Sequence, residues 1–184
     1  MSRGLPEYLE RKAAAIAGAA RERPTGEAWR ERVVARAWAG DLTGVRRLRI
    51  RDWEWISDSG PAFGGWGLGP SSPELLCGVL ATCLTHTYEI MAAQLGLAIE
   101  RVEVHVSASN NDARFAGIDT DDPAWPWDFR AEVELEAPAL SAQEVGRLHA
   151  AAEASCPLTN LLRRATEVEV VAIGSAPGER GRSS

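Results

Sequence analysis

The chain has 184 residues, 45% of them hydrophobic, with a formal net charge of −6 and a sequence pI near 5.2. This length suits one domain with a core of its own, and the hydrophobic content excludes a disordered chain. The acidic balance argues against nucleic acid and anionic membranes as partners. No N-terminal stretch has the pattern of a signal peptide and no window has 18 unbroken apolar residues, so we expect a soluble, cytoplasmic protein.

The first part of the chain predicts one helix and three strands. Residues 5–23 are rich in Ala, Arg and Glu and predict an amphipathic helix that ends before Pro24. We assign residues 1–28 to this helical extension, which we expect at the periphery, where it could brace a partner chain. Weak apolar–polar alternation then predicts an antiparallel meander of strands within 29–39, 45–50 and 53–56.

A glycine-rich loop at 58–69 leads into the stretch from Gly69 to Gln94, which predicts a long central helix ended by Gly96. Turn and capping residues open it, and Pro73 stands where the first helical turn tolerates proline. The apolar side chains recur at three- and four-residue spacing and form one stripe: Leu76, Val79, Leu80, Cys83, Leu84, Thr87, Ile90 and Met91. A cysteine on such a stripe is either a packed core residue or a working thiol.

Two strands with clear alternation follow, at 102–106 and 129–135. The long irregular segment between them, 107–127, is of a kind that is usually functional or mobile. Trp125 and Trp127 in this segment could line a pocket, but covering exposed sheet is the commoner role, and we expect that role here.

The last part of the chain predicts a broken helix and a final strand. Ser141, with Glu144 three residues on, predicts a capping box and a helix to Ser155. Cys156-Pro157 then begins a short second helix through Arg164. We expect a last strand that closes the sheet and contains Val168, Val170 and Ala172. We expect the main domain to span 29–174 and a disordered tail to follow at 175–184. The fold class is α+β, with antiparallel strands packed around the central helix.

The chain has three cysteines, which is a small and odd number and does not suit the disulfide framework of a secreted protein. In a reducing cytosol a cysteine is either buried or chemically used. Cys77 and Cys83 are six residues apart, about 9 Å along a helix and on different faces, and no CxxC or HxxxH pair is present. We therefore expect no metal site.

The run GPSSPELLCGVLATC leads along a helix to Cys83, and AEASCPLTNLL places Cys156 before a proline. These two motifs, and the spacing between them, resemble the OsmC/Ohr family of organic hydroperoxide reductases. The resemblance spans roughly 30–173. It implies an OsmC-like fold, an intertwined homodimer, and a thiol peroxidase for alkyl or lipid hydroperoxides. Cys83 would be the peroxidatic thiolate and Cys156 the resolving thiol, with an external dithiol as reductant and no cofactor.

The resemblance also implies that Glu74 pairs with an arginine that activates the thiol. An ideal helix places Glu74 about 13 Å from Cys83 on the opposite side, so it would act through an arginine or from the other subunit. Stabilisation of the helix dipole is a sufficient structural explanation of Glu74. His86, three residues after Cys83, is a candidate base. We expect the other two histidines, at 105 and 149, to be solvated.

The chain departs from the family pattern at the first hairpin turn, residues 39–44, which contains no arginine. The nearby arginines are candidates for the activating cation: Arg36, Arg46, Arg47 and Arg49. Without a cation, Cys83 would keep a thiol pKa near or above about 8.5 and react poorly. The alternative function is therefore a non-catalytic OsmC-like dimer that binds an apolar small molecule between its subunits, with Trp-rich walls.

Overall fold

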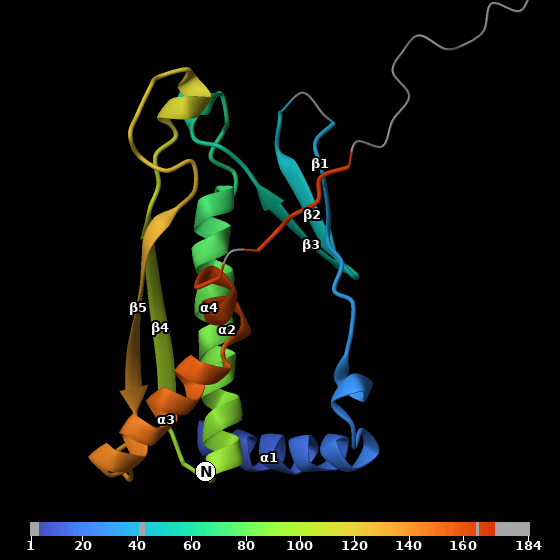
Figure 1. Ribbon diagram of the computed structural model, residues 1–184, viewed down its shortest axis with the longest axis vertical. Coiled ribbons are helices and arrows are strands. Elements are labelled where there is room, and N and C mark those ends of the chain that lie inside the picture. The colour runs from blue at the N-terminus through green and yellow to red at the C-terminus, as the bar shows by residue number, and fades with distance from the viewer. Residues whose placement is uncertain (1–3, 41–42, 165, 172–184) are drawn as a thin grey trace, which may run out of the picture.

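The long helix α2 (Ser72–Leu95) lies at the centre of the structure, and β4, α3, α1 and α4 pack around it (Figure 1). This computed structural model describes residues 4–40, 43–164 and 166–171. Ser71 and Glu74 form a capping box at the start of α2, and Gly96, at φ 66°, ends it. The predicted central helix is confirmed. By length and composition α2 also meets the criterion for a membrane span, as core helices of soluble proteins often do.

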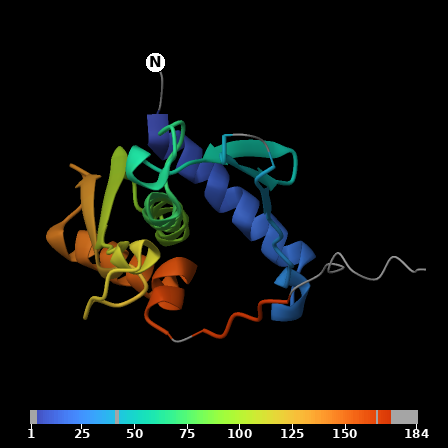
Figure 2. The ribbon, with the colours of Figure 1, turned by 90° about the horizontal axis from the view of Figure 1, so that it is seen from above.

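The strands form two antiparallel sheets. The first has the order β1 (Arg36–Trp38), β2 (Arg46–Ile50) and β3 (Trp53–Ser57), which confirms the meander with a first strand shorter than predicted. The second pairs β4 (Arg101–Ser109) with β5 (Trp127–Glu136). The first sheet stands apart from the layer of β4, β5 and α2 (Figures 1 and 2).

The helices other than α2 mostly match their predictions. The helix α1 (Gly4–Glu22) packs on α2 through Leu9, which is buried, and through an ion pair between Lys12 and Glu89 at 3.1 Å. It therefore braces α2 of its own chain. The capping box at Ser141 opens α3 (Ala142–Ser155), and α4 (Pro157–Leu162) ends before the predicted Arg164.

Within the described ranges, the connections contain three one-turn 3-10 helices: η1 (Gly26–Trp29), η2 (Pro61–Phe63) and η3 (Ala113–Ala116). The segment between β4 and β5 is shorter than predicted, because β4 continues to Ser109 and pairs there with Trp127. The core consists of residues from α1, α2, α3 and the α2–β4 connection, together with Cys156: Leu9, Leu80, Leu84, Tyr88, Ala92, Ala93, Leu97, Ile99, Leu148, Ala152 and Cys156.

Two predictions from apolar pattern are wrong for this single chain. Residues 166–171 form no strand, and Val168 and Val170 are 81% and 91% exposed. A strand needs the edge of another strand for its backbone hydrogen bonds, and the single chain offers no such pairing to the described segment. Val79, assigned to the buried stripe of α2, is 47% exposed. Ala172 and the tail at 175–184 lie outside the described residues.

The loop between β3 and α2 is held by Asp58, which is only 2% exposed. Its carboxylate accepts hydrogen bonds from the backbone N–H groups of Ser59, Trp66 and Leu68, at 2.7, 3.0 and 3.1 Å. The backbone crosses itself closely here, because a Cβ on Gly65 would overlap the Ser59 carbonyl. The loop therefore delivers the chain to the start of α2 along a fixed path.

Candidate functional site

Cys83 lies midway along α2, half-buried on the side that faces α3 and α4. The hydroxyl of Thr87, one turn further on, donates to the Cys83 carbonyl at 2.8 Å. Cys156 occupies the corner where α3 ends and α4 begins, and it is fully buried. Its N–H donates to the Ala152 carbonyl at 3.0 Å and so completes the last turn of α3.

The two predicted cysteines meet. Their Sγ atoms are 3.6 Å apart, although 73 positions separate them in the chain. All three cysteines are free thiols, and Cys77 lies elsewhere on α2, beside Glu74 in a shallow pocket. A disulfide bond is about 2.05 Å long, so Cys83 and Cys156 need to approach by only about 1.5 Å to form one.

The environments of the two sulfurs move their pKa values in opposite directions. Burial raises the pKa of Cys83, and the neighbouring Cys156 raises it further, against smaller opposing effects of the Leu158 N–H and the Thr87 hydroxyl. Burial also acts to raise the pKa of Cys156. Hydrogen bonds outweigh burial and lower this pKa: those of the Thr159 hydroxyl, the Thr159 N–H, Cys83 and the Leu158 N–H. Within one chain, these contacts therefore favour the thiolate form of Cys156 over that of Cys83.

The candidate arginines all lie on the first sheet, and among the described residues none is hydrogen-bonded to a cysteine. Arg46 donates to the hydroxyls of Ser59 and Ser57 at 3.3 and 3.1 Å. The remaining three have partners on the same sheet or are exposed: Arg49 pairs with Glu54, Arg36 lies over the Trp38 ring, and Arg47 is exposed. No arginine of the described chain thus activates Cys83 directly.

Glu74 and His86 are not brought to the thiols. The Glu74 carboxylate accepts the N–H and the hydroxyl of Ser71, both at 2.7 Å, and these hydrogen bonds lower its pKa. His86 is exposed, in a shallow pocket against β4. Within one chain Glu74 therefore acts as a helix cap.

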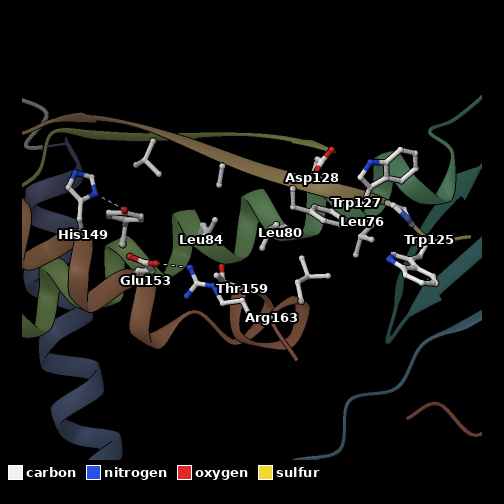
Figure 3. Close-up of a pocket in the computed structure, with 16 residues that line it drawn as sticks. Leu76, Leu80, Leu84, Trp125, Trp127, Asp128, His149, Glu153, Thr159 and Arg163 are labelled. Atoms are coloured by element: carbon white, nitrogen blue, oxygen red, sulfur yellow. Dashed lines mark hydrogen bonds and ion pairs between the residues drawn. The ribbon is translucent and has the colours of Figure 1, made fainter. Parts of the chain in front are cut away.

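A cavity of about 930 Å³ lies between α2, β5, α3 and α4 (Figure 3). Its apolar floor is a line of α2 side chains at four-residue spacing, Leu76, Leu80 and Leu84. Trp125 and Trp127 stand at one end and His149 at the other (Figure 3). We expected Trp125 and Trp127 to cover an exposed part of a sheet. Instead, both line the cavity, and Trp125 is 67% exposed.

The polar end of the cavity is the part of the site that the sequence did not reveal. The hydroxyl of Tyr88 and Nδ1 of His149 are 2.6 Å apart, so His149 is not the solvated residue that we expected. Burial, and then Glu153, raise the pKa of Tyr88. Arg163 pairs with Glu153 at 2.6 Å, so the two charges at this end cancel. Tyr88 continues the four-residue spacing of the cavity floor, which was the one available signal.

Cys83 and Cys156 do not line the cavity, but Thr159 does. The Thr159 hydroxyl is buried and makes no other hydrogen bond within the described residues, so its proton is available to a Cys156 thiolate. Thr159 is therefore the link between the cavity and the thiol pair. Within the same described residues, no three His, Cys, Asp or Glu side chains gather closely enough to hold a metal ion.

Comparison with known proteins assigns the chain to a family. The family model described as OsmC-like protein matches residues 64–171, more than half of the chain and both cysteine motifs. The chain belongs to the OsmC-like family. No match was found among curated proteins.

Solved structures of OsmC-like proteins share the fold at low sequence identity. An OsmC-like protein from Mycoplasma pneumoniae is 18% identical, with a TM-score of 0.61 over 72% of this chain and 88% of that one. A putative osmotic stress induced and detoxification response protein from Psychrobacter arcticus is 16% identical, with a TM-score of 0.55 over 72% and 90%. An organic hydroperoxide resistance protein OsmC from Legionella pneumophila is 20% identical, with a TM-score of 0.50 over 72% and 90%.

Proposed function

We propose that the protein is a cysteine-based peroxidase that reduces organic hydroperoxides, either alkyl or lipid. The observation that carries this proposal is the 3.6 Å separation of the Cys83 and Cys156 sulfurs on an OsmC-like scaffold. Two free thiols at that distance are suited to two-electron chemistry. The Legionella pneumophila relative, described as an organic hydroperoxide resistance protein, supports the choice of substrate class.

The proposed reaction has two steps within the protein. The Cys83 thiolate attacks the terminal peroxide oxygen, the O–O bond breaks, and the alcohol leaves after taking up a proton. The Cys156 sulfur then attacks the resulting Cys83 sulfenic acid, the S–S bond forms, and the oxygen leaves as water with the thiol proton. An external dithiol reduces the disulfide, in keeping with a cytoplasmic location, and no cofactor takes part.

Accessibility supports Cys83 as the sulfur that meets the peroxide, because it is half-buried whereas Cys156 is fully buried. The raised pKa of Cys83 opposes this role. We therefore propose that the protein works as a homodimer in which an arginine from the first sheet of one chain approaches Cys83 of the other. Glu74 would orient that arginine, as the resemblance to the family implies.

The proposed place for the organic part of the peroxide is the cavity. Its leucine floor and tryptophan end suit an alkyl or aromatic body, and burial of apolar ligand surface stabilises binding by about 25 cal/mol per Å². Thr159 joins this cavity to the thiol pair. A hydroperoxide with a large apolar group is therefore expected to react faster than hydrogen peroxide.

A second candidate function is supported by two observations of the same site. Neither sulfur lines the cavity, and no described arginine is hydrogen-bonded to a cysteine. Both observations fit a non-catalytic OsmC-like dimer that binds an apolar small molecule. Such a protein would bind cumene or its alcohol, detectable by Trp fluorescence, and would show no thiol oxidation by cumene hydroperoxide.

The decisive experiment follows the consumption of tert-butyl and cumene hydroperoxide by the reduced protein in the presence of a dithiol. Cys83→Ser is expected to abolish turnover. Cys156→Ser is expected to lose turnover while still consuming one equivalent of peroxide. Cys77→Ser is the matched control and should behave as the wild type. Turnover by Cys83→Ser, or no thiol oxidation in the wild type, would exclude the peroxidase.

A further inference from the structure

At the corner between α3 and α4, where Cys156 lies, backbone carbonyls need hydrogen-bond donors from outside their own helix. The last four carbonyls of an α-helix have no intrahelical donor, and α3 ends at Ser155. Pro157, which begins α4, has no N–H to offer them. The chain therefore has to find donors elsewhere if the backbone on both sides of Cys156 is to stay fixed.

Asn160 supplies these donors. Its side-chain Nδ2 donates to the Ala154 carbonyl at 3.0 Å and to the Cys156 carbonyl at 2.9 Å. Its backbone N–H also donates to the Cys156 carbonyl, at 3.1 Å. Asn160 thus makes three hydrogen bonds to two carbonyls, that of Ala154 and that of Cys156. None of these bonds involves the sulfur, so Asn160 can act on the thiol only through the backbone.

A second contact spans the same corner on the solvent side. Arg163, directly after α4, pairs with Glu153 of α3, and the two side chains are 54% and 64% exposed. Exposed ion pairs contribute little to stability. Of these two side-chain contacts, that of Asn160 therefore contributes more to fixing the Cys156 backbone, alongside the hydrogen bond from the Cys156 N–H to Ala152.

We propose that Asn160 is a positioning residue for the resolving step, which holds the Cys156 sulfur within reach of Cys83. This inference rests on the proposed peroxidase function. Resolution competes with attack of a second peroxide molecule on the Cys83 sulfenic acid, which gives an irreversible sulfinic acid. In resolution, the Cys156 sulfur displaces the sulfenic oxygen, which leaves as water with the thiol proton. A Cys156 held 3.6 Å away favours this outcome over the second oxidation.

The test uses Asn160→Asp, which keeps the shape and removes the donor, and Asn160→Ala, which removes it without adding charge. Arg164→Gln is the matched control, because Arg164 is an exposed residue near the same corner that does not line the cavity. Each reduced protein is treated with excess cumene hydroperoxide without reductant, and intact mass separates the disulfide from the sulfinic acid. Both Asn160 variants should raise the ratio of sulfinic acid to disulfide about tenfold, with an unchanged rate of the first oxidation. Arg164→Gln should match the wild type.

A second measurement does not depend on peroxide chemistry. Equilibration with mixtures of a reduced and an oxidised dithiol gives the constant for forming the Cys83–Cys156 disulfide. This constant should fall about tenfold in both Asn160 variants and stay unchanged in Arg164→Gln. Wild-type constants in Asn160→Asp and Asn160→Ala would overturn the positioning role. Failure of the wild type to react with peroxide would overturn the peroxidase alone, because the exchange equilibrium would still decide the role of Asn160.

Discussion

At the scale of single residues, each cysteine of the pair alters the acidity of the other. Cys156 contributes to the raised pKa of Cys83, and Cys83 contributes to the lowered pKa of Cys156. Cys156→Ser should therefore lower the pKa of Cys83, and Cys83→Ser should raise that of Cys156. A shift of half a pKa unit changes the thiolate fraction about threefold at neutral pH.

The pH dependence of alkylation by iodoacetamide, followed by mass spectrometry, measures both shifts. The midpoint for Cys83 should move to lower pH in Cys156→Ser, and the midpoint for Cys156 to higher pH in Cys83→Ser. Cys77, followed in the same samples, is the internal control. Midpoints that do not move would show that the two sulfurs are not coupled in solution.

Glu74 has two possible roles, and one substitution separates them. Gln at this position of a capping box still reaches back to the N-cap, so Glu74→Gln should leave the unfolding temperature nearly unchanged. Loss of the carboxylate should release the proposed activating arginine and raise the pKa of Cys83 by about one unit, about tenfold in thiolate. Peroxide turnover at neutral pH is the measurement. Unchanged turnover would leave Glu74 as a helix cap only.

The sequence predicted those residues of the site that belong to recognisable motifs. It did not predict contacts between segments that are distant in the chain and meet only by packing. The resemblance carried by the two cysteine motifs implies that Cys83 and Cys156 form a pair, and their sulfurs lie 3.6 Å apart. The contact between Tyr88 and His149 joins residues 61 positions apart, and no local pattern links them. His149 lies three residues before the buried Ala152 on α3, and its contact with Tyr88 of α2 accompanies its half-buried position.

At the scale of elements, the loop from β3 to α2 depends on one buried carboxylate. The N–H groups of Leu68 and Ser59 lower the pKa of Asp58, against the effect of burial. A carboxyl with a lowered folded pKa stabilises the protein above its unfolded pKa, near 3.9, and this stabilisation is lost as the pH falls through the folded value. Asp58→Asn should therefore lower the unfolding temperature by several degrees at neutral pH.

The difference between Asp58→Asn and the wild type should shrink below about pH 3.9, where the wild-type carboxyl becomes protonated in the unfolded chain. Hydrogen exchange of the loop amides at Trp66 and Leu68 should accelerate as well. Asp52→Asn, at the exposed turn between β2 and β3, is the matched control and should change neither measurement. An Asp58→Asn protein with wild-type stability at neutral pH would contradict the role of the carboxylate.

Elements with local signals were predicted well, and elements that need a partner were not. Capping boxes at Ser71 and Ser141 fix their helices within a few residues, so α2 and α3 were found from sequence. The predicted strand at 168–172 was wrong for one chain over its described part, because alternation of apolar residues says nothing about where the partner edge lies. Its valines are apolar and exposed, as a strand without a partner would be.

At the scale of the whole molecule, the single chain exposes more surface than a folded monomer should. Its accessible area is 14409 Å², whereas a monomer of 19.8 kDa exposes about 8,600 Å². An upper-bound allowance for the residues outside the described ranges removes roughly 2,100 Å² of this excess. The remainder, roughly 3,700 Å², exceeds the roughly 800 Å² that each partner buries in a standard interface.

One face of the first sheet is apolar and uncovered. Paired residues of adjacent strands point to the same side, so the pairs Leu48–Trp55 and Ile50–Trp53 share one face. Trp53 and Trp55 stack on each other, with ring centroids 6.5 Å apart, and are 61% and 49% exposed. Patches of this kind mark interaction surfaces. We expect a second copy of the chain to cover this face.

Two substitutions on opposite faces of the same strands test this expectation. The wild type should have a solution mass of about twice 19.8 kDa by light scattering or sedimentation. Trp55→Glu places a charge on the apolar face and should shift the protein toward monomer or unfold it, because an unpaired charge is costly to bury. Ile56→Glu places the same charge on the opposite face of the same strand and should remain a dimer. A wild type that stays monomeric at micromolar concentration would contradict both the dimer and a shared thiol site.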